Sequence, residues 1–364
     1  MTRKLRVLYC IDSLKMGGAE RITAALMPHL TDITPIICTL YDHESPLKQQ
    51  VESIPSVNLD AKRLIDLSAF RHFLRVIKDE RIDVIHAQLQ HATIFASLAQ
   101  SLRGIPFVVT RHITTDDIST QKRKWLVDVE RYAFRRTKRL IYVSDATSKY
   151  HQNILKMPPS KYTTIYNGID LAKFQVDKDR RALAQELGFP TDKPLVVMVG
   201  VMRPGKGHVV AIDAARQLPA VNFLMVGDGE DADSIKAYAK GLDNVIFLGT
   251  RKDVPTILKA VDMLILPSDM EALPTVLIEA GAAGLPSIAS DVGGVTEIVV
   301  DDETGIVIPP QDPDSLAAAI QRLIADPALM ENMGKAAFER IQATFTLQNQ
   351  ARELTALYHE VVKQ

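Results

Sequence analysis

The sequence predicts an α/β protein made of two Rossmann-like β/α/β domains. Short apolar runs, such as Leu5–Ile11 and Leu195–Gly200, are each followed by a loop with glycine and then by a helical pattern. Such runs are typical of parallel strands that are buried on both faces, with helices as crossover connections. The pattern starts again in the second half, and 364 residues are enough for two domains.

Composition narrows the class of protein. Hydrophobic residues make up 46% of the chain, which excludes a disordered protein. The only cysteines, Cys10 and Cys38, cannot form a disulfide framework and suit a reducing, cytoplasmic location. No uninterrupted apolar stretch approaches ~18 residues, so we expect no membrane-spanning segment. The apolar run Val7–Ile11 is too short for a signal peptide and suits a first strand.

The net charge of −1 conceals an asymmetry between the two halves. Residues 1–175 contain 26 Lys or Arg and 17 Asp or Glu, whereas the rest of the chain contains 17 and 27. Opposite signs suit two domains with different partners. The net charge of large domains also varies by this amount by chance. Both interpretations, different partners and chance variation, therefore stay open.

In the first half, Leu5–Ile11 is the first expected strand, and Gly17-Gly18 in the following loop opens a helix over residues 20–30. Paired glycines let a backbone approach a ligand closely, although they also form ordinary tight turns. His86 and His112 are expected at the carboxyl ends of two further strands, the edge at which open α/β sheets bind ligands. A single histidine at such a place is more often structural.

A basic run extends from Lys122 to Arg139 and contains eight basic and two acidic residues. It suits contact with an anionic membrane surface or an anionic substrate. A solvated helix face explains the run equally well. Nucleic acid is disfavoured because no recognisable binding motif accompanies the run.

A boundary between the domains is expected near residue 175, after the Asn167-Gly168 turn. Beyond it, the loop Arg203–His208 leads into a helix, and a glycine-flanked lysine with an arginine at a helix entrance suits a diphosphate. Gly227–Ala232 matches the dinucleotide pattern G-x-G-x-x-A, which is weak alone. No acidic residue clearly ends the next strand, Val245–Leu248, and this counts against a dehydrogenase.

The stretch Ser268–Val299 organises the second half. It follows the apolar strand Met263–Leu266, and Pro274 suits the first turn of the next helix. Glu271 lies in the loop before this helix and Glu279 lies inside it. Helix N-termini attract phosphate, so nearby carboxylates make sense when they accept hydrogen bonds from hydroxyls of the same ligand. A nucleotide sugar carries both parts, a diphosphate and many hydroxyls.

The segments EALPTVLIEA, AAGLPSIAS and DVGGVTEIV together resemble the signature of glycosyltransferase family 4, which has the GT-B fold. The segments GGAER, NGID, RPGKG, VGDGE and FLGTRKDVP also fit the family pattern, so the resemblance covers nearly the whole chain. It implies two Rossmann-like domains that face a central cleft. Residues 1–175 would bind the acceptor, residues 176–345 would bind the nucleotide sugar, and a helix in residues 346–364 would cross back to the first domain.

The resemblance implies a retaining glycosyltransferase that takes a sugar from a nucleotide-sugar donor, with a UDP-sugar favoured. The acceptor would be a glycan, a lipid-linked sugar or a small molecule. No metal or other cofactor is expected, because no cluster of His, Asp or Cys has convincing metal-ligand spacing. The implied location is the cytoplasm, with peripheral contact at the inner face of an anionic membrane, and no nucleic-acid partner.

The resemblance also implies roles for single residues. Glu271 would hold the sugar, and His112 stands where the family has a histidine beside the donor sugar, so these two are the implied catalytic residues. The diphosphate would be neutralised by Lys206, Arg203 and the helix amides. Glu279 would accept hydrogen bonds from ribose hydroxyls. The implied donor-binding residues are Gly17, Gly18, Arg203, Lys206, Thr250, Leu273, Thr275, Val276 and Glu279.

Three positions depart from the family pattern. Val201 stands where many members carry arginine, and Arg203 is the candidate replacement. Ala272 stands where the family usually has glycine, which would tighten the sugar pocket. Gln88 occupies the place of a second histidine, which weakens the case for a role of His86.

Other functions remain open at this point. A GT-B epimerase or hydrolase acting on a sugar nucleotide would need no acceptor. A non-catalytic binding module would be expected to lack Glu271, Lys206 or Glu279, and all three are present. A dehydrogenase would have to bind a nicotinamide cofactor.

Overall fold

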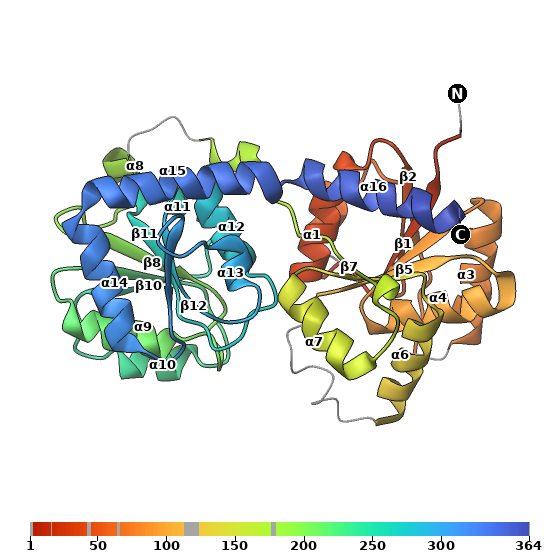
Figure 1. The fold of residues 1–364 in the computed structure, drawn as a ribbon, viewed down its shortest axis with the longest axis horizontal. Helices are drawn as coiled ribbons and strands as arrows, with labels where there is room; N and C mark the ends of the chain where they lie inside the picture. The colour runs from red at the N-terminus through yellow and green to blue at the C-terminus, as the bar shows by residue number, and fades with distance from the viewer. Residues whose placement is uncertain are drawn as a thin grey trace. The chain divides into compact units, whose positions relative to one another are not determined.

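The computed structural model describes residues 3–15, 17–41, 45–63, 66–112, 124–175 and 180–363 and divides into two compact units (Figure 1). Unit 1 comprises Met1–Gly168 together with Leu347–Gln364, and unit 2 comprises Ile169–Thr346. The division thus falls after Gly168, a few residues before the boundary expected near residue 175. The last helix belongs to unit 1 although it follows unit 2 in the chain.

Unit 1 is built on a seven-stranded sheet with the order β3-β2-β1-β4-β5-β6-β7, and every neighbouring pair is parallel. The strands are β1 (Arg6–Ile11), β2 (Thr34–Thr39), β3 (Ser56–Asn58), β4 (Val84–Gln88), β5 (Phe107–Arg111), β6 (Arg139–Tyr142) and β7 (Tyr162–Thr164).

Helices cover both faces of this sheet, which is why its central strands are apolar on both sides. On β1, Leu8 and Cys10 join one core, and Val7, Tyr9 and Ile11 join the other. The first core includes residues of α3 (Leu67–Asp79), α4 (Gln90–Arg103) and α6 (Lys124–Arg136). The second includes residues of α1 (Gly18–Leu26), α2 (Leu47–Gln50) and α16 (Leu347–Lys363). The remaining helix, α7 (Asp145–Leu155), follows β6.

Unit 2 repeats the design with six parallel strands in the order β10-β9-β8-β11-β12-β13. The strands are β8 (Leu195–Val199), β9 (Asn222–Val226), β10 (Val245–Gly249), β11 (Met263–Leu266), β12 (Ser287–Ser290) and β13 (Gly305–Ile308). The helices are α8 (Arg180–Glu186), α9 (His208–Gln217), α10 (Ala232–Tyr238), α11 (Val254–Ala260), α12 (Thr275–Ala282), α13 (Val295–Ile298), α14 (Pro313–Ala325) and α15 (Pro327–Thr344).

Side-chain caps fix several helix starts. Ser144 accepts a hydrogen bond from the Thr147 N–H and begins α7. Asp66 and Asp312 cap α3 and α14 in the same way. The helix expected over residues 20–30 is shorter, because Pro28 lacks an N–H and the chain tightens into a 3₁₀ turn over Met27–His29.

The elements that were not predicted from the sequence include β3, α13 and α15. The strand β3 has no fully buried residue, and α13 has only four residues, so neither carries a readable period. Helix α15 buries two large residues, Met333 and Ile341, and two small ones, Gly334 and Ala337. A Cβ at Gly334 would lie 2.2 Å from the carbonyl oxygen of Gly284, so this glycine permits a close backbone approach.

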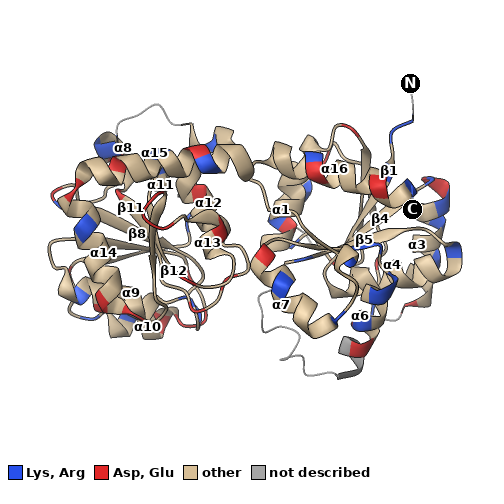
Figure 2. Cartoon of the chain, in the orientation of Figure 1, with Lys and Arg blue, Asp and Glu red and all other residues tan. Residues whose placement is uncertain are grey.

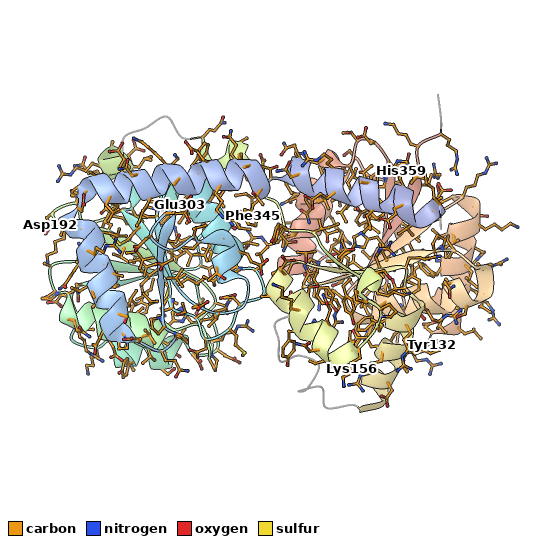
Figure 3. The ribbon with its side chains drawn as sticks, in the orientation of Figure 1. Tyr132, Lys156, Asp192, Glu303, Phe345 and His359 are labelled. Atoms are coloured by element: carbon orange, nitrogen blue, oxygen red, sulfur yellow. The ribbon has the colours of Figure 1, made fainter. Side chains whose placement is uncertain are left out.

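The last helix, α16, carries an apolar stripe that is buried in unit 1, and its members are Leu347, Leu354, Leu357, Tyr358 and Val361. His359, which follows Tyr358 in the chain, is exposed on the opposite face of α16 (Figure 3). The helix therefore stays on unit 1 through one amphipathic face.

A chain of buried polar groups ties α16 to the sheet. The Tyr358 hydroxyl contacts the Tyr9 hydroxyl and lies 2.6 Å from His86 Nδ1, and His86 Nε2 lies 2.6 Å from Thr110 Oγ1. His86 was expected at a strand end, but it lies in the middle of β4 and is 1% exposed. Burial, with a smaller effect of His112, lowers the pKa of His86 to about 3. His86 is therefore a structural histidine.

We predict that Tyr358→Phe lowers the free energy of unfolding by about 1–3 kcal/mol, because Tyr9 and His86 lose a buried hydrogen-bond partner. Urea denaturation should show this through the fluorescence of Trp125, the chain's single tryptophan, which lies in α6 of unit 1. His359→Ala, on the exposed face of the same helix, is the matched control and should leave the midpoint unchanged. Equal midpoints for Tyr358→Phe and the wild type would contradict the prediction.

Candidate active site

The strand order of unit 2 reverses between β8 and β11, with β9 and β10 on one side and β12 and β13 on the other. In open parallel sheets, ligands bind outside the carboxyl ends of the strands at such a point. The loop after β8 carries Arg203 and Lys206, and the loop after β11 carries Glu271 and Leu273. The sheet therefore brings two predicted segments, far apart in the sequence, to the same place.

Glycines hold these loops together by direct backbone packing. Gly207 has φ +78°, and a Cβ there would lie 1.9 Å from the carbonyl oxygen of Pro267 in the loop after β11. Gly293, in the loop after β12, has φ +52°, and a Cβ there would lie 1.7 Å from the carbonyl oxygen of Glu271. Only glycine fits such contacts and such φ values without strain. The backbone near Lys206 and the backbone of Glu271 are therefore fixed by packing.

Lys206 and Glu271 contact each other across this point. Lys206 Nζ donates to Glu271 Oε1 at 2.7 Å, and the two side chains are 19% and 8% exposed. Beside them the Asp269 N–H donates to the Gly205 carbonyl oxygen at 2.8 Å, which joins the two loops. Water screens a pair this buried less than it screens a surface pair. The two residues were assigned to different parts of a ligand, and the structure makes them neighbours.

Helix α12 starts one residue later than expected, because Pro274 is its N-cap residue and not part of its first turn. Among the residues that the structure describes, no side chain caps the helix, so the first N–H groups at Thr275 and Val276, both half-buried, are available to a ligand. Glu279 lies one turn further along and is half-buried, and Leu273 is buried before the helix begins.

The other predicted donor-binding residues of unit 2 are more exposed. Arg203 lies in the same loop as Lys206, and its side chain is exposed. Thr250 directly follows β10 and is also exposed, but β9 separates its strand from β8. The structure therefore gathers Arg203, Lys206, Glu271 and the start of α12 at the reversal point, and it leaves Thr250 two strands away along the same edge.

In unit 1 the strand order reverses between β1 and β4. Gly17 is the N-cap residue of α1 and Gly18 is its first residue, in the loop after β1. Asp12, directly after β1, accepts a hydrogen bond of 2.8 Å from the Ala92 N–H at the start of α4. Burial raises the pKa of Asp12. The glycine pair therefore lies at the edge where a ligand of unit 1 is expected.

His112 follows β5 at the same edge of unit 1 and is half-buried. Its Nε2 lies 3.0 Å from Oε1 of Gln88, and Thr23 Oγ1 lies 2.7 Å from the same oxygen. Burial, with a smaller effect of the Arg111 charge, lowers the pKa of His112 to about 4. The ring is therefore neutral near pH 7 and acts there as a hydrogen-bonding group. Gln88, which the sequence marked only as a departure, is the residue that orients it.

Two serines at the unit 2 edge were not singled out from the sequence. Ser268 and Ser290 follow or end the neighbouring strands β11 and β12, and both are fully buried. Among the described residues, neither hydroxyl has a hydrogen-bond partner. Buried hydroxyls are normally bonded, so each has capacity for a further partner. No sequence pattern distinguishes them from serines in ordinary strand ends.

Within the described ranges, no group of three or more His, Cys, Asp or Glu side chains is placed to hold a metal ion. The chain has Asp-x-Asp segments, and two of them lie at helix starts: Asp231–Asp233 begins α10, and at Asp312–Asp314 the Asp312 side chain caps α14. No helix in the part of the chain that the structure describes is long and apolar enough to cross a membrane.

Two family models match the chain in succession, Glycosyltransferase Family 4 over residues 16–173 and Glycosyl transferases group 1 over residues 179–340. The chain belongs to glycosyltransferase family 4. A relative from Escherichia coli, UDP-Gal:alpha-D-GlcNAc-diphosphoundecaprenol alpha-1,3-galactosyltransferase, is 28% identical, and the match covers 95% of each chain. N-acetyl-alpha-D-glucosaminyl L-malate synthase from Bacillus anthracis is 27% identical over 94% of this chain and 89% of its own.

Among solved structures, Anabaena HepE in complex with UDP superposes with a TM-score of 0.87 at 22% identity, over 98% of this chain and 100% of that one. This likeness and the two parallel sheets confirm the predicted GT-B fold. The family models and the named relatives confirm that the protein is a glycosyltransferase, and the other functions left open by the sequence are set aside.

The glycosyltransferase uses the glycines of its dinucleotide-like pattern for packing. A Cβ at Gly227 would lie 1.9 Å from the carbonyl oxygen of Gly200, and a Cβ at Gly229 would lie 2.2 Å from that of Met202. Both glycines let the loop after β9 lie against the loop after β8. The match to G-x-G-x-x-A therefore reflects loop packing and not a nicotinamide site.

We predict that His112→Gln makes this glycosyltransferase less sensitive to acid. A histidine whose folded pKa is about 4 binds a proton only in the unfolded chain between that value and about 6.5, so its contribution to stability is lost as the pH falls through this window. Between pH 7 and pH 5, the free energy of unfolding of the wild type should therefore fall by about 1–2 kcal/mol more than that of the variant. Denaturant midpoints across this range measure it, with the exposed His359→Gln as control. Identical slopes for His112→Gln and the wild type would refute the low pKa.

Proposed function

We propose that this glycosyltransferase moves a sugar from a UDP-sugar to a sugar or lipid-linked acceptor, with retention of the anomeric configuration. The observation that carries the donor site is the Lys206–Glu271 contact at the reversal point of unit 2, beside the uncapped start of α12. The E. coli relative, whose name gives UDP-Gal as the donor, supports the uridine nucleotide. The family resemblance supports retention.

The donor diphosphate is proposed to bind where positive charge and free N–H groups converge. When the bond between the anomeric carbon and the diphosphate oxygen breaks, negative charge develops on the diphosphate. Lys206, Arg203 and the N–H groups of Thr275 and Val276 are the donors that would stabilise it. The acceptor oxygen bonds to the same face of the anomeric carbon, and its proton passes to the departing diphosphate.

The two acids are proposed to hold different parts of the donor. Glu271, with 8% of its side chain exposed, would accept hydrogen bonds from sugar hydroxyls. Glu279, one turn into α12 from Thr275, would accept from the ribose. At the edge of unit 1, neutral His112 and the Gly17-Gly18 backbone are proposed to contact substrate.

We also propose that the reaction needs no metal ion. Two cationic side chains, Lys206 and Arg203, lie in one loop beside a helix start, and together they supply the positive charge that a diphosphate leaving group requires. The proposal makes turnover independent of chelators.

We favour a lipid-linked acceptor over a free small molecule. The name of the E. coli relative, whose match covers more of both chains than that of the B. anthracis relative, gives an acceptor linked to diphosphoundecaprenol. The structure offers a surface that suits such an acceptor. Helix α6 of unit 1 carries several basic residues (Figure 2), and Arg131 and Arg135 are exposed beside Tyr132, itself 52% exposed. Exposed cations next to an exposed aromatic ring favour an anionic membrane surface.

We predict that UDP-sugars raise the thermal stability of the protein more than GDP- or ADP-sugars do, because a ligand bound only by the folded state stabilises it. With the preferred UDP-sugar and a lipid-linked acceptor, NMR should show that the product keeps the donor's anomeric configuration. The turnover rate should be the same with and without EDTA. Lys206→Met should lower kcat/KM by roughly a hundredfold, and Lys240→Met, an exposed lysine of unit 2, should not. An inverted product would overturn retention, and loss of turnover in EDTA that manganese restores would overturn metal independence.

We predict that the protein sediments with vesicles that contain anionic lipid and not with neutral vesicles, and that salt weakens the binding. Each basic residue near the surface contributes on the order of 1 kcal/mol. Arg131→Gln with Arg135→Gln should therefore reduce the partition coefficient at least tenfold. Lys236→Gln with Lys240→Gln removes the same charge from exposed sites in unit 2 and is the control. Equal recovery on neutral and anionic vesicles at low salt would reject the membrane contact.

A further inference from the structure

We propose that the Lys206–Glu271 pair makes the donor site select the intact nucleotide sugar over the nucleoside diphosphate that the reaction releases. The inference rests on the proposed function, because it places a diphosphate at Lys206. It assigns Glu271 a second role, in which its charge opposes the product as well as holding the sugar.

The first step is geometric. Lys206 Nζ lies 2.7 Å from Glu271 Oε1, so any phosphate oxygen that binds this ammonium group comes close to the carboxylate. The carboxylate has little room to withdraw, because its own backbone carbonyl packs against Gly293 and its side chain is 8% exposed. A ligand at Lys206 must therefore share the ammonium group with Glu271.

The second step concerns charge. The terminal phosphate of a nucleoside diphosphate loses a second proton near pH 6, so near pH 7 the free diphosphate carries about one more negative charge than the same diphosphate esterified to a sugar. This extra charge lies on the phosphate that would face Lys206. In a site where both protein side chains are largely shielded from water, repulsion between that phosphate and the Glu271 carboxylate is weakly screened.

The third step concerns hydrogen bonds. An intact donor carries sugar hydroxyls next to the same phosphate, and these hydroxyls can donate to Glu271 and so satisfy its oxygens. The free diphosphate has only acceptor oxygens at that position. Glu271 therefore gains hydrogen-bond donors from the intact donor, and from the released product it meets only negative charge. Specificity of this kind comes from repelling the wrong ligand as well as attracting the right one.

The other acids of the loops after β11 and β12 do not pair with Lys206 among the described residues. Asp269 is half-buried and shares its loop with Glu271, but it contacts the loop of Lys206 through a backbone hydrogen bond to the Gly205 carbonyl oxygen. Asp291, after β12, is exposed. Within the described residues, the ion pair of Lys206 is with Glu271 alone.

The test measures the affinity of the full chain for UDP, UMP and the preferred UDP-sugar by titration calorimetry. Glu271→Gln keeps the shape of the side chain and removes its charge. We expect this variant to bind UDP roughly tenfold more tightly, which corresponds to about 1.4 kcal/mol. It should bind UMP unchanged, because UMP lacks the second phosphate. Its affinity for the UDP-sugar should not rise, and its kcat should fall.

Two further variants identify the cause. Glu303→Gln removes one negative charge from an exposed site of unit 2 (Figure 3) and should leave all three affinities unchanged. In a Lys206→Met background, Glu271→Gln should no longer tighten UDP binding by the same factor, because the ammonium group that both anions share is gone. An equal gain in both backgrounds would refute the shared-lysine mechanism.

The outcomes separate the two proposals. A wild type that binds neither UDP nor any UDP-sugar refutes the proposed function. A wild type that binds both and turns over, together with a folded Glu271→Gln variant whose UDP affinity equals that of the wild type, refutes only this inference. Circular dichroism of Glu271→Gln establishes that the variant is folded.

Discussion

Every parallel strand in both units must be covered by helices on two faces, and this constraint determines where chemistry can occur. Each crossover returns the chain to the same end of the sheet, so all the strands of a unit finish at one edge. The interior on both sides is filled with apolar side chains, as at Leu8 and Val7 on neighbouring positions of β1. The residues of the candidate donor site, such as Lys206 and Glu271, accordingly lie in the loops at the carboxyl edge.

At that edge in unit 2, backbone packing replaces side-chain packing. Gly207, Gly227 and Gly293 each let one loop lie within contact of the carbonyl oxygen of another. Loops held in this way fix the backbones that carry Lys206 and Glu271, whose Nζ and Oε1 atoms lie 2.7 Å apart. A single site then combines an ammonium group, a carboxylate and the first N–H groups of α12, which suits a ligand with a diphosphate and hydroxyls. In unit 1 the corresponding edge holds His112, whose pKa burial lowers to about 4.

Local patterns allowed much of the fold to be predicted from the sequence. The run Met263–Leu266 is β11 without correction, because a continuous apolar segment bounded by a polar loop has few alternatives. The start of α12 was misplaced by one residue, at Pro274, since proline is tolerated at both positions. Helix α15 was missed because its buried face, Met333, Gly334, Ala337 and Ile341, includes a glycine, which is unfavourable inside a helix.

Contacts between distant residues could not be predicted in the same way. Lys206 and Glu271 were both chosen as site residues, but their contact depends on the strand order, which places β8 beside β11. Gln88 orients His112 across two neighbouring strands, and no spacing in the sequence indicates this. His86 was placed at a strand end because the end of β4 extends two residues further than its apolar run suggests.

The most direct test of the donor site is hydrogen–deuterium exchange of the full chain with and without UDP. The account predicts slower exchange in Arg203–Gly207 and at Thr275–Val276 together; protection confined to other segments, with these two unchanged, would contradict it.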